Sequence, residues 1–315
     1  GEKMRQRGSI LERLGDIKEF VSEYGACMKY WTEALSLWVK LQERERIAGV
    51  HRKMASVFWD FLDNTEKAKE HHAEALEILE TEPKSIELAK LYEDMARMYD
   101  ATGEPSKALS LAEKALGLAQ ELNAQEIKAS AYATFGEILT ETEDVRKGIE
   151  CMERALKIAI ENNYVETALR AYGMCGWRLS FGYHNWAQGL ESHKKGYELA
   201  KKVGAIRYQS AMGSNLSQFY YGMGDISKSI ALGEESIALD RKAGNMRQLY
   251  WDLTYLAWSY QVVGDIDKSE QCLKESLNMS KSLGYTNNWH YGRYYFEKGD
   301  YVKAREYLEK RLEYK

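Results

Sequence analysis

Proline is almost absent from this chain, which has two in 315 residues. With so few backbone breaks, 29% charged residues and 12% aromatic residues, the composition is typical of amphipathic helices with an aromatic interior and unlike that of sheets or disordered chains. Long apolar runs are missing as well, because no stretch approaches the ~20 apolar residues that a membrane span requires. The composition therefore predicts an all-α protein outside the membrane.

Cysteine is also scarce. The four cysteines are Cys27, Cys151, Cys175 and Cys272. They lie far apart and form no CxxC pair, so we expect buried thiols of a reducing compartment and no disulfides. Residues 1–7 have no apolar run after their charges, so no signal peptide is predicted and we expect a soluble, cytoplasmic protein. The first residue is Gly rather than Met, which suggests a tag remnant or an excised fragment of a larger protein.

Neither sign of charge dominates the chain. It has 44 Lys and Arg against 48 Asp and Glu, a net charge of −4, and the charges are spread along the sequence rather than gathered in blocks. No nucleic-acid footprint and no polybasic membrane patch is present. We expect a protein, a peptide or a small effector as partner, and neither nucleic acid nor membrane.

Enzyme signatures are missing too. GxxxxGK[ST], HExxH and GxSxG do not occur, and no carboxylate pair stands in an apolar setting that would split two pKa values. His71 and His72 are neighbours on an expected helix and point about 100° apart, so they cannot share a metal. His184 and His193 have a spacing that no recurrent metal site uses. We predict no catalytic activity, no metal and no cofactor.

A helical phrase of the type Ala-Leu-x-Leu is what the chain has in place of these signals. It recurs seven times with copies 40 or 41 residues apart, beginning at residues 34, 75, 115, 155, 196, 236 and 276. Such a period indicates stacked copies of one supersecondary unit. We expect a single solenoid domain over residues 1–315. Its repeats are residues 4–44, 45–84, 85–124, 125–164, 165–205, 206–245, 246–285 and 286–315.

Residues 212–245 show the repeating unit. Apolar residues at spacings of three and four mark two helices. Between them, Gly224 supplies a left-handed residue and Asp225 an N-cap for the second helix. Gly264 and Gly299 are followed by Asp in the same way. The unit is therefore a helix, a tight turn and a helix, but residues 176–186 replace the clean turn and predict a longer or distorted one.

One large side chain recurs on six of the eight first helices, opposite small residues. The recurring residues are Trp59, Tyr99, Leu139, Tyr220, Tyr260 and Tyr295. Small residues such as Gly136 and Gly148 permit close approach of the two helices. We therefore assign the recurring large residues to the core.

The unit resembles the tetratricopeptide repeat. The family's pattern is a Leu-Gly pair, a Tyr, a turn Gly and three spaced Ala or small residues. In the third repeat it reads as Met95-Ala96, Tyr99, Gly103, Ala108 and Ala115. The period is longer than the family's common length of about 34 residues. In this it is similar to the long arrays of signal-transduction ATPases, nucleotide cyclases and MalT-type regulators, and also to kinesin light chains and Rap-type regulators. The resemblance implies an α-α superhelix of about eight repeats.

The resemblance also implies that the first helices line a concave face. In the fifth to eighth repeats its inward positions are rich in aromatic and arginine side chains, from which binding hot spots are built. The predicted binding residues are Met174, Arg178, Phe181, Gln218, Tyr221, Trp251, Tyr255, Trp258, Trp289, Arg293 and Phe296. In the first three repeats the same face is charged with both signs. A secondary charged face is predicted at Lys53, Lys90 and Arg97.

Two functions remain open on this basis. The first is a non-catalytic module that binds a partner segment or an effector in the groove, as the sensor or regulatory array of a larger signalling protein. The second is a freestanding scaffold that joins partners through its outer faces, with the aromatic residues merely packed against neighbouring repeats. The family's clamp for chaperone C-termini is not expected, because Asp94 stands where it needs an Asn beside Lys53 and Lys90.

Overall fold

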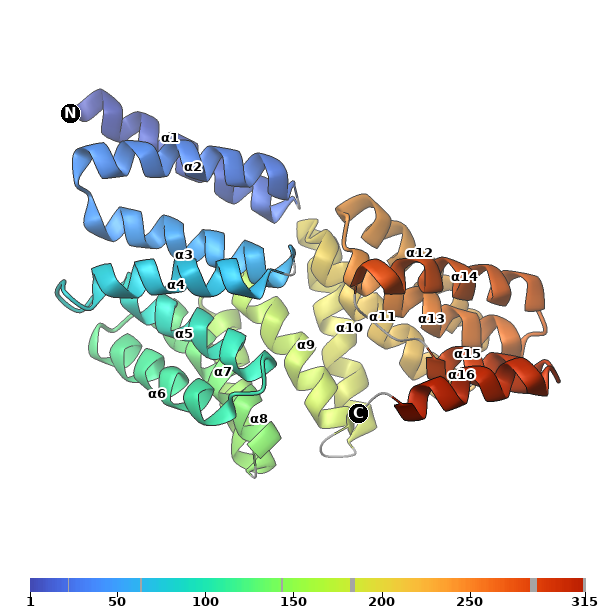
Figure 1. The fold of residues 1–315 in the computed structure, drawn as a ribbon. Coiled ribbons are helices and arrows are strands. Elements are labelled where there is room, and N and C mark those ends of the chain that lie inside the picture. Colours follow the sequence, from blue (N-terminus) through green and yellow to red (C-terminus); the bar gives the residue numbers. More distant parts are fainter. Residues whose placement is uncertain (22, 63, 143, 182–184, 284–287, 314–315) are drawn as a thin grey trace. The chain divides into compact units, whose positions relative to one another are not determined.

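The computed structural model describes residues 1–21, 23–62, 64–142, 144–181, 185–283 and 288–313. Over these residues the chain forms sixteen helices and no strand, which confirms the all-α prediction and the count of about eight repeats (Figure 1). The helices pair as α1 (Glu2–Phe20) with α2 (Tyr24–Leu41), α3 (Arg44–Asp60) with α4 (Thr65–Leu79), α5 (Ile86–Ala101) with α6 (Pro105–Glu121), α7 (Gln125–Thr142) with α8 (Val145–Glu161), α9 (Val165–Phe181) with α10 (Trp186–Val203), α11 (Ile206–Gly222) with α12 (Ile226–Ala243), α13 (Met246–Val262) with α14 (Ile266–Leu283), and α15 (Asn288–Glu297) with α16 (Tyr301–Glu313). None of the described helices is both long and apolar enough to cross a membrane.

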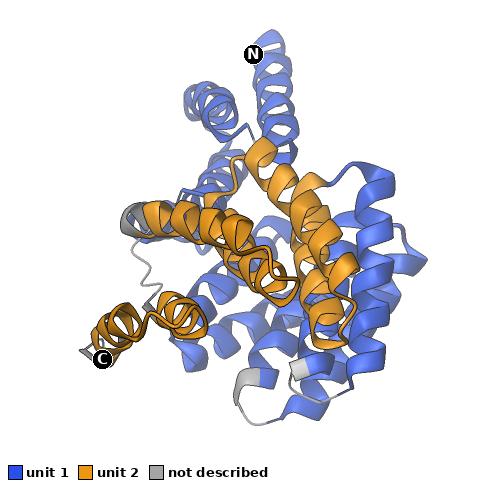
Figure 2. Cartoon of the chain, turned by 90° about the vertical axis from the view of Figure 1, so that its right-hand side faces the viewer, with its two compact units in different colours: residues 1–205 blue, residues 206–315 orange. Residues whose placement is uncertain are grey.

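The repeats fall into two compact units (Figure 2). Unit 1 is residues 1–205 with helices α1 to α10, and unit 2 is residues 206–315 with helices α11 to α16. The boundary coincides with the predicted boundary between the fifth and sixth repeats. One continuous domain over residues 1–315 stays a prediction.

The turns inside the repeats have the predicted chemistry. Gly224 adopts a φ of 81°, which a glycine reaches without the steric cost of a Cβ. Asp225 then caps α12, because its side chain accepts the backbone N–H of Lys228. Between repeats, Asn123 and Asn163 take left-handed φ values of 51° and 58°. The irregular turn expected in the fifth repeat includes residues 182–184, which lie outside the described residues.

Close contact between paired helices depends on glycine at one place in particular. A Cβ added to Gly136 on α7 would lie 2.6 Å from the carbonyl oxygen of Gly148 on α8. A Cβ added to Gly148 would meet the Gly136 carbonyl oxygen at the same distance. The predicted role of these small residues is therefore confirmed.

The recurring large residues of the first helices are less buried than predicted. Leu139 and Tyr260 lie in the core, but the other four are half-buried. A lysine from the first turn of the second helix covers the ring in several repeats, as Lys107 covers Tyr99 at 3.6 Å and Lys268 covers Tyr260 at 5.0 Å from the ring centroid. The lysine lies three residues after the acidic residue that precedes the second helix, Glu104 or Asp265, so the spacing of an acidic residue and a lysine was the signal for this contact.

The four cysteines agree with the expectation of internal thiols. Cys27, Cys151 and Cys175 are buried and Cys272 is half-buried. Burial, together with the smaller effect of the negative charge of Glu153, raises the pKa of Cys175 to about 12. Such thiols are poor nucleophiles.

The first helices of successive repeats lie next to one another. In unit 1, α3 packs beside α5, α5 beside α7 and α7 beside α9, and in unit 2 α11 packs beside α13. Side chains about 40 residues apart in the sequence are therefore brought together on one face. The candidate binding sites lie on these faces.

Candidate binding sites on the first helices

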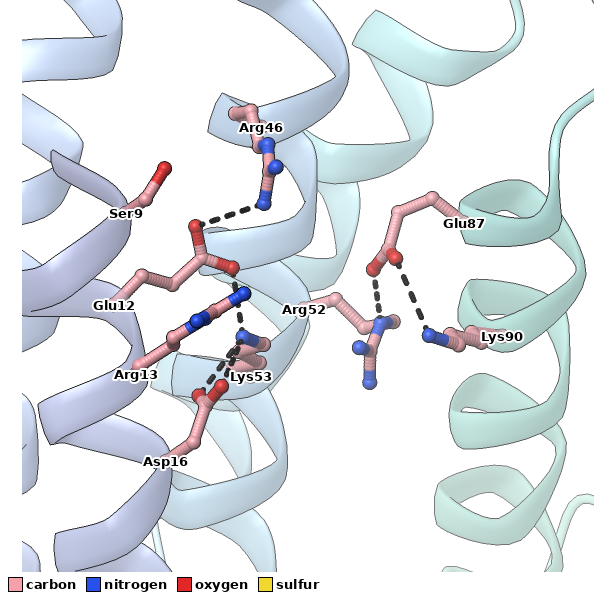
Figure 3. A pocket seen from close by; sticks show the side chains of 9 residues that line it. All are labelled: Ser9, Glu12, Arg13, Asp16, Arg46, Arg52, Lys53, Glu87 and Lys90. Atoms are coloured by element: carbon pink, nitrogen blue, oxygen red, sulfur yellow. Dashed lines mark hydrogen bonds and ion pairs between the residues drawn. The ribbon is translucent and has the colours of Figure 1, made fainter. Parts of the chain in front are cut away.

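In unit 1, a pocket of about 290 Å³ opens between α1, α3 and α5 (Figure 3). It contains two of the predicted charged residues, Lys53 and Lys90. The residues that line this charged pocket are Ser9, Glu12, Arg13, Asp16, Arg46, Arg52, Lys53, Glu87 and Lys90. The three arginines were not among the predicted residues, because a long arginine side chain reaches a pocket from a position beside the inward-facing ones.

Lys53 joins α3 to α1. Its Nζ lies 2.7 Å from Glu12 Oε1 and 2.8 Å from Asp16 Oδ1. Asp16 Oδ1 also accepts the indole N–H of Trp31 at 3.1 Å. Lys53 is therefore neutralised within the protein, although it faces the pocket.

Arg52 joins α3 to α5. Its guanidinium donates to Glu87 at 2.5 Å and to Asp94 at 2.7 Å. Burial of Glu87 would raise the pKa of that carboxyl, but the charge and hydrogen bond of Arg52 outweigh burial and lower it. Asp94 is also an acceptor for the Ser56 hydroxyl. The carboxylate at the position where a chaperone clamp needs an Asn is thus held by Arg52.

A second buried ion pair continues along the same face. Arg170 on α9 lies 2.6 Å from Glu93 on α5, and Thr134 on α7 donates its hydroxyl to the same carboxylate at 2.5 Å. Burial would raise the pKa of Glu93, but the charges of Arg170 and Arg97 outweigh it and hold the pKa at about 2. Three first helices are therefore tied by one carboxylate.

The third predicted residue of the charged face, Arg97, lies outside the pocket. It pairs with Asp60 at 3.4 Å and with Asp94 at 3.7 Å. Its guanidinium also lies 5.5 Å from the ring of Trp59. Arg97 is therefore engaged within unit 1.

In unit 2, rings gather around Trp258 on α13. The centroid of Trp258 lies 5.4 Å from Tyr255, 6.5 Å from Tyr221 and 5.0 Å from His290. Trp251 joins this group by stacking on Tyr255 at 6.2 Å and by an edge contact with His290 at 6.3 Å. Aromatic pairs at these distances are favourable beyond their buried area.

Arg293 on α15 completes this aromatic cluster, which we define as Tyr221, Trp251, Tyr255, Trp258, His290 and Arg293. Its guanidinium carbon lies 5.0 Å from the centroid of Trp258, a cation–π contact. Two buried nitrogen atoms of the cluster, Trp258 Nε1 and His290 Nδ1, have no hydrogen-bond partner among the described residues. Burial, together with the smaller effect of the positive charge of Arg293, lowers the pKa of His290 to about 4, so the ring is neutral at pH 7.

The structure brings five predicted binding residues into this cluster and places the others elsewhere. Trp289 is 54% exposed, and its neighbour His290 faces the rings instead, because successive helical residues point about 100° apart. Phe296 is 60% exposed and contacts Tyr301. Gln218 is half-buried on α11.

The remaining predicted residues belong to unit 1. Met174 packs against a core cluster that contains Met152 and Cys175, so it takes the packing alternative. Arg178 is half-buried on α9. The side chain of Phe181 lies outside the described part of the structure.

Two buried carboxyls in unit 2 correct the expectation that no carboxylate pair stands in an apolar setting. Asp240 on α12 and Asp252 on α13 are 0% and 2% exposed. Burial raises the pKa of Asp240 to about 8, helped by the charge of Asp252, and burial raises the pKa of Asp252 to about 6. Asp252 stands between two apolar residues in the sequence, Trp251 and Leu253, which was the signal that its carboxyl is buried.

Hydroxyl and amide groups hold one oxygen of each carboxyl. Ser210 donates to Asp240 Oδ1 at 2.5 Å, and Ser214 donates to Asp252 Oδ1 at 2.6 Å. Gln248 also donates to Asp252 Oδ1, at 2.8 Å. The two Oδ2 atoms are buried and accept no other hydrogen bond among the described residues. A hydrogen bond between the two carboxyls also raises the pKa of Asp240, so the pair holds one proton.

The comparisons with known proteins agree with this architecture. Profiles of the tetratricopeptide repeat match residues 46–121 and 129–159. Over these residues the chain carries tetratricopeptide repeats. This family's fold is one that supports protein–protein interaction. Repeat proteins of this kind are in general non-catalytic.

One relative and two solved structures illustrate the likeness. The chain is 26% identical to tetratricopeptide repeat protein 29 of Trypanosoma brucei brucei over 143 residues, which cover 45% of this chain and 29% of that protein. The chain therefore spans less than a third of this relative's length.

The first solved structure is a Signal Transduction ATPase with Numerous Domains from Pyrococcus horikoshii that has a tetratricopeptide repeat sensor. It is 17% identical, with a TM-score of 0.67, and the match covers 98% of this chain and 48% of that one. The second is a Rap protein complexed with competence and sporulation factor, 12% identical with a TM-score of 0.67, covering 98% and 86% of the two chains. At these identities the likeness shows the fold alone.

Proposed function

We propose that this chain is a non-catalytic module that binds a peptide or protein segment on the first helices of its repeats. The observation that carries the proposal is the aromatic cluster of unit 2, where Trp258 lies among three rings and under Arg293. Aromatic and arginine side chains supply most of the binding energy at protein interfaces. A surface made of them is built for a partner rather than for packing alone.

The chemistry of the cluster indicates what the segment contains. The ring faces of Tyr221, Trp251 and Tyr255 are half-buried and fit an apolar or aromatic side chain. Arg293 pairs with Glu297 at 2.8 Å, but both side chains are about 40% exposed, and such a pair contributes little. A carboxylate of the partner can replace Glu297, so the proposed segment has an acidic residue next to an aromatic or apolar one.

The proposed role is that of the sensor or regulatory array of a larger signalling protein. Support comes from the ATPase of Pyrococcus horikoshii, whose tetratricopeptide repeats are described as a sensor, and from the Rap protein that is complexed with a factor. Both have the fold found here over 98% of this chain. The sequences of the peptides that bind the aromatic cluster test this role.

Selection from a random peptide library tests the binding site even though the natural partner is unidentified. Peptides are selected on the wild-type chain, and their affinities for Trp258→Ala and Arg293→Gln are measured by calorimetry. We expect each substitution to weaken binding by about 2 kcal/mol, or roughly 30-fold. Tryptophan fluorescence of the wild type should change on titration.

Trp186→Ala is the matched control, because Trp186 is an exposed tryptophan of unit 1 outside the cluster. It should leave the affinity unchanged. If peptides bind Trp258→Ala and Arg293→Gln as tightly as the wild type while circular dichroism shows intact helices, the aromatic cluster is not the site. Selected peptides that bind only outer-face residues would favour the scaffold function instead.

A further inference from the structure

The charged pocket of unit 1 has an excess of positive charge. Five of its lining residues are cationic and three are acidic, and Asp94 behind the lining pairs with Arg52 at 2.7 Å, so one positive charge remains in excess. Its volume of about 290 Å³ exceeds what a bound water or a single carboxylate would fill. A pocket of this kind attracts an anion, and the question is which anion its cations can hold.

The cations of the pocket differ in how well they are neutralised. Arg52 and Lys53 each lie within 3 Å of two carboxylates. By contrast, Arg46 is 3.5 Å from its acceptor and Lys90 is 3.9 Å from its own. Arg13 makes no hydrogen bond and no ion pair within the part of the chain that the structure describes. Three cations of the rim are therefore available.

These three cations come from three different helices. Arg13 lies on α1, Arg46 on α3 and Lys90 on α5, and all three side chains line the same pocket (Figure 3). The inner cations hold the frame in place, since Lys53 ties α3 to α1 and Arg52 ties α3 to α5. The rim is thus presented on helices that are already cross-linked, which reduces the ordering cost of binding.

We propose that this pocket binds a phosphoryl group, supplied by a phosphorylated side chain or by a small phosphorylated molecule. A phosphoryl group carries about −1.5 to −2 charges at pH 7 and three acceptor oxygens. It therefore offers one acceptor oxygen to each of the three cations, whereas a carboxylate has only two oxygens. Arginine forks bind phosphate oxygens in pairs, and the hydroxyl of Ser9 adds a further donor at the rim.

The test uses calorimetry at constant ionic strength with O-phospho-L-serine, inorganic phosphate and L-aspartate as probes. We expect the two phosphoryl probes to bind and L-aspartate to bind at least about tenfold more weakly, since a charge-assisted hydrogen bond is lost. A serine-phosphorylated peptide with blocked ends distinguishes the sources. Tighter binding of this peptide than of free phosphoserine assigns the site to a phosphoprotein, and the reverse order assigns it to a small molecule.

Arg13→Gln and Lys90→Gln should each weaken phosphoserine binding about tenfold. The matched control is Arg7→Gln, which removes the same charge from the exposed face of α1 and should change nothing. The indole N–H of Trp31 is a second readout, because it donates to Asp16 in the pocket wall and its nuclear magnetic resonance signal should shift on binding.

Several results would overturn the proposal. They are the absence of phosphoryl binding, equal binding of L-aspartate, and equal weakening by Arg7→Gln, which would mean unspecific attraction. Phosphoryl binding in unit 1 does not depend on the function proposed for unit 2. Trp258→Ala should leave phosphoserine binding intact, so the two can fail separately.

Discussion

Unit 1 and unit 2 present the same helices of the same repeat but join them by different chemistry. In unit 1 the first helices are tied by ion pairs, with Lys53 between α1 and α3 and Arg170 between α5 and α9. In unit 2, Ser214 of α11 bonds Asp252 of α13, and the rings around Trp258 cover the face. The repeat therefore sets where a side chain lies and leaves its chemistry open.

The difference determines which side chains on each face can still contact a partner. Most of the inner charges that the structure describes in unit 1 are paired within the protein, whereas Arg46 and Lys90 at the rim of the charged pocket have long ion pairs. The aromatic cluster of unit 2 keeps half-buried ring faces and an arginine whose ion pair with Glu297 is exposed. Unit 1 thus uses its inner charges mainly within the protein, whereas unit 2 keeps the ring faces on which we propose that a partner binds.

The largest expected effect is a loss of stability when a buried ion pair of unit 1 is broken. Arg170→Ala leaves the carboxylate of Glu93 buried without its charge partner, so we expect unit 1 to lose about 3 kcal/mol of unfolding free energy. Hydrogen exchange followed by mass spectrometry measures this for unit 1 separately. Arg146→Ala, which removes an exposed pair with Glu150, should cost less than about 0.5 kcal/mol. Equal effects of the two substitutions would contradict the buried pair.

The second effect is confined to unit 2 and depends on pH. Unfolded aspartate ionises near its ordinary pKa of 3.8, whereas the folded pair of Asp240 and Asp252 keeps a proton up to about pH 8. Between pH 6 and 8 the folded state therefore binds one proton more than the unfolded state, and stability falls by about 1.4 kcal/mol for each unit of rising pH.

Asp240→Asn provides the control for this pH dependence. Its amide keeps an oxygen for the Ser210 hydroxyl and a donor for Asp252. The unfolding free energy of unit 2 should then be nearly constant over the same range in urea titrations. A wild-type unit 2 that grows more stable from pH 6 to 8 would show that the carboxyls do not share a proton.

The smallest expected effect is the loss of stability when the lysine that covers a recurring tyrosine is removed, and it should be equal in the two units. Lys107→Ala in unit 1 and Lys268→Ala in unit 2 remove the lysine that covers a recurring tyrosine. Each should cost about 0.5 to 1 kcal/mol, the range of an exposed cation–π contact. Thermal unfolding measures both, with Lys29→Ala as an exposed control on α2. A clear difference between the two would mean that the units also differ at their turns.

Much of the fold could be predicted from the sequence, because its signals are local. The 40-residue period, the left-handed glycine at Gly224 and the cap at Asp225 all describe neighbouring residues, and all three are confirmed. Of the eleven predicted binding residues, five lie together in the aromatic cluster, and their role in binding stays a prediction. His290 was missed and Trp289 chosen, because one position of helical register changes the direction of a side chain by about 100°.

The pairing of side chains could not be predicted in the same way. Glu93 and Arg170 are 77 residues apart, and Asp240 and Asp252 are brought together only where α12 packs on α13. The sequence pattern does not show which charged residues on this face form an ion pair. Lys53 forms one with Glu12, whereas Arg13 forms none within the described residues. The distance between two helices decides this, and it follows from core packing.

The sequence by itself determined that this protein is a chain of helix-turn-helix repeats with a charged inner face in its first half and an aromatic one in its second. These properties depend on periodicity and turn residues, which act over a few neighbours. The tertiary structure alone decided the boundary at residues 205 and 206, the pocket between α1, α3 and α5, and the rings around Trp258. These depend on contacts between residues about 40 apart, whose geometry is set when the helices pack.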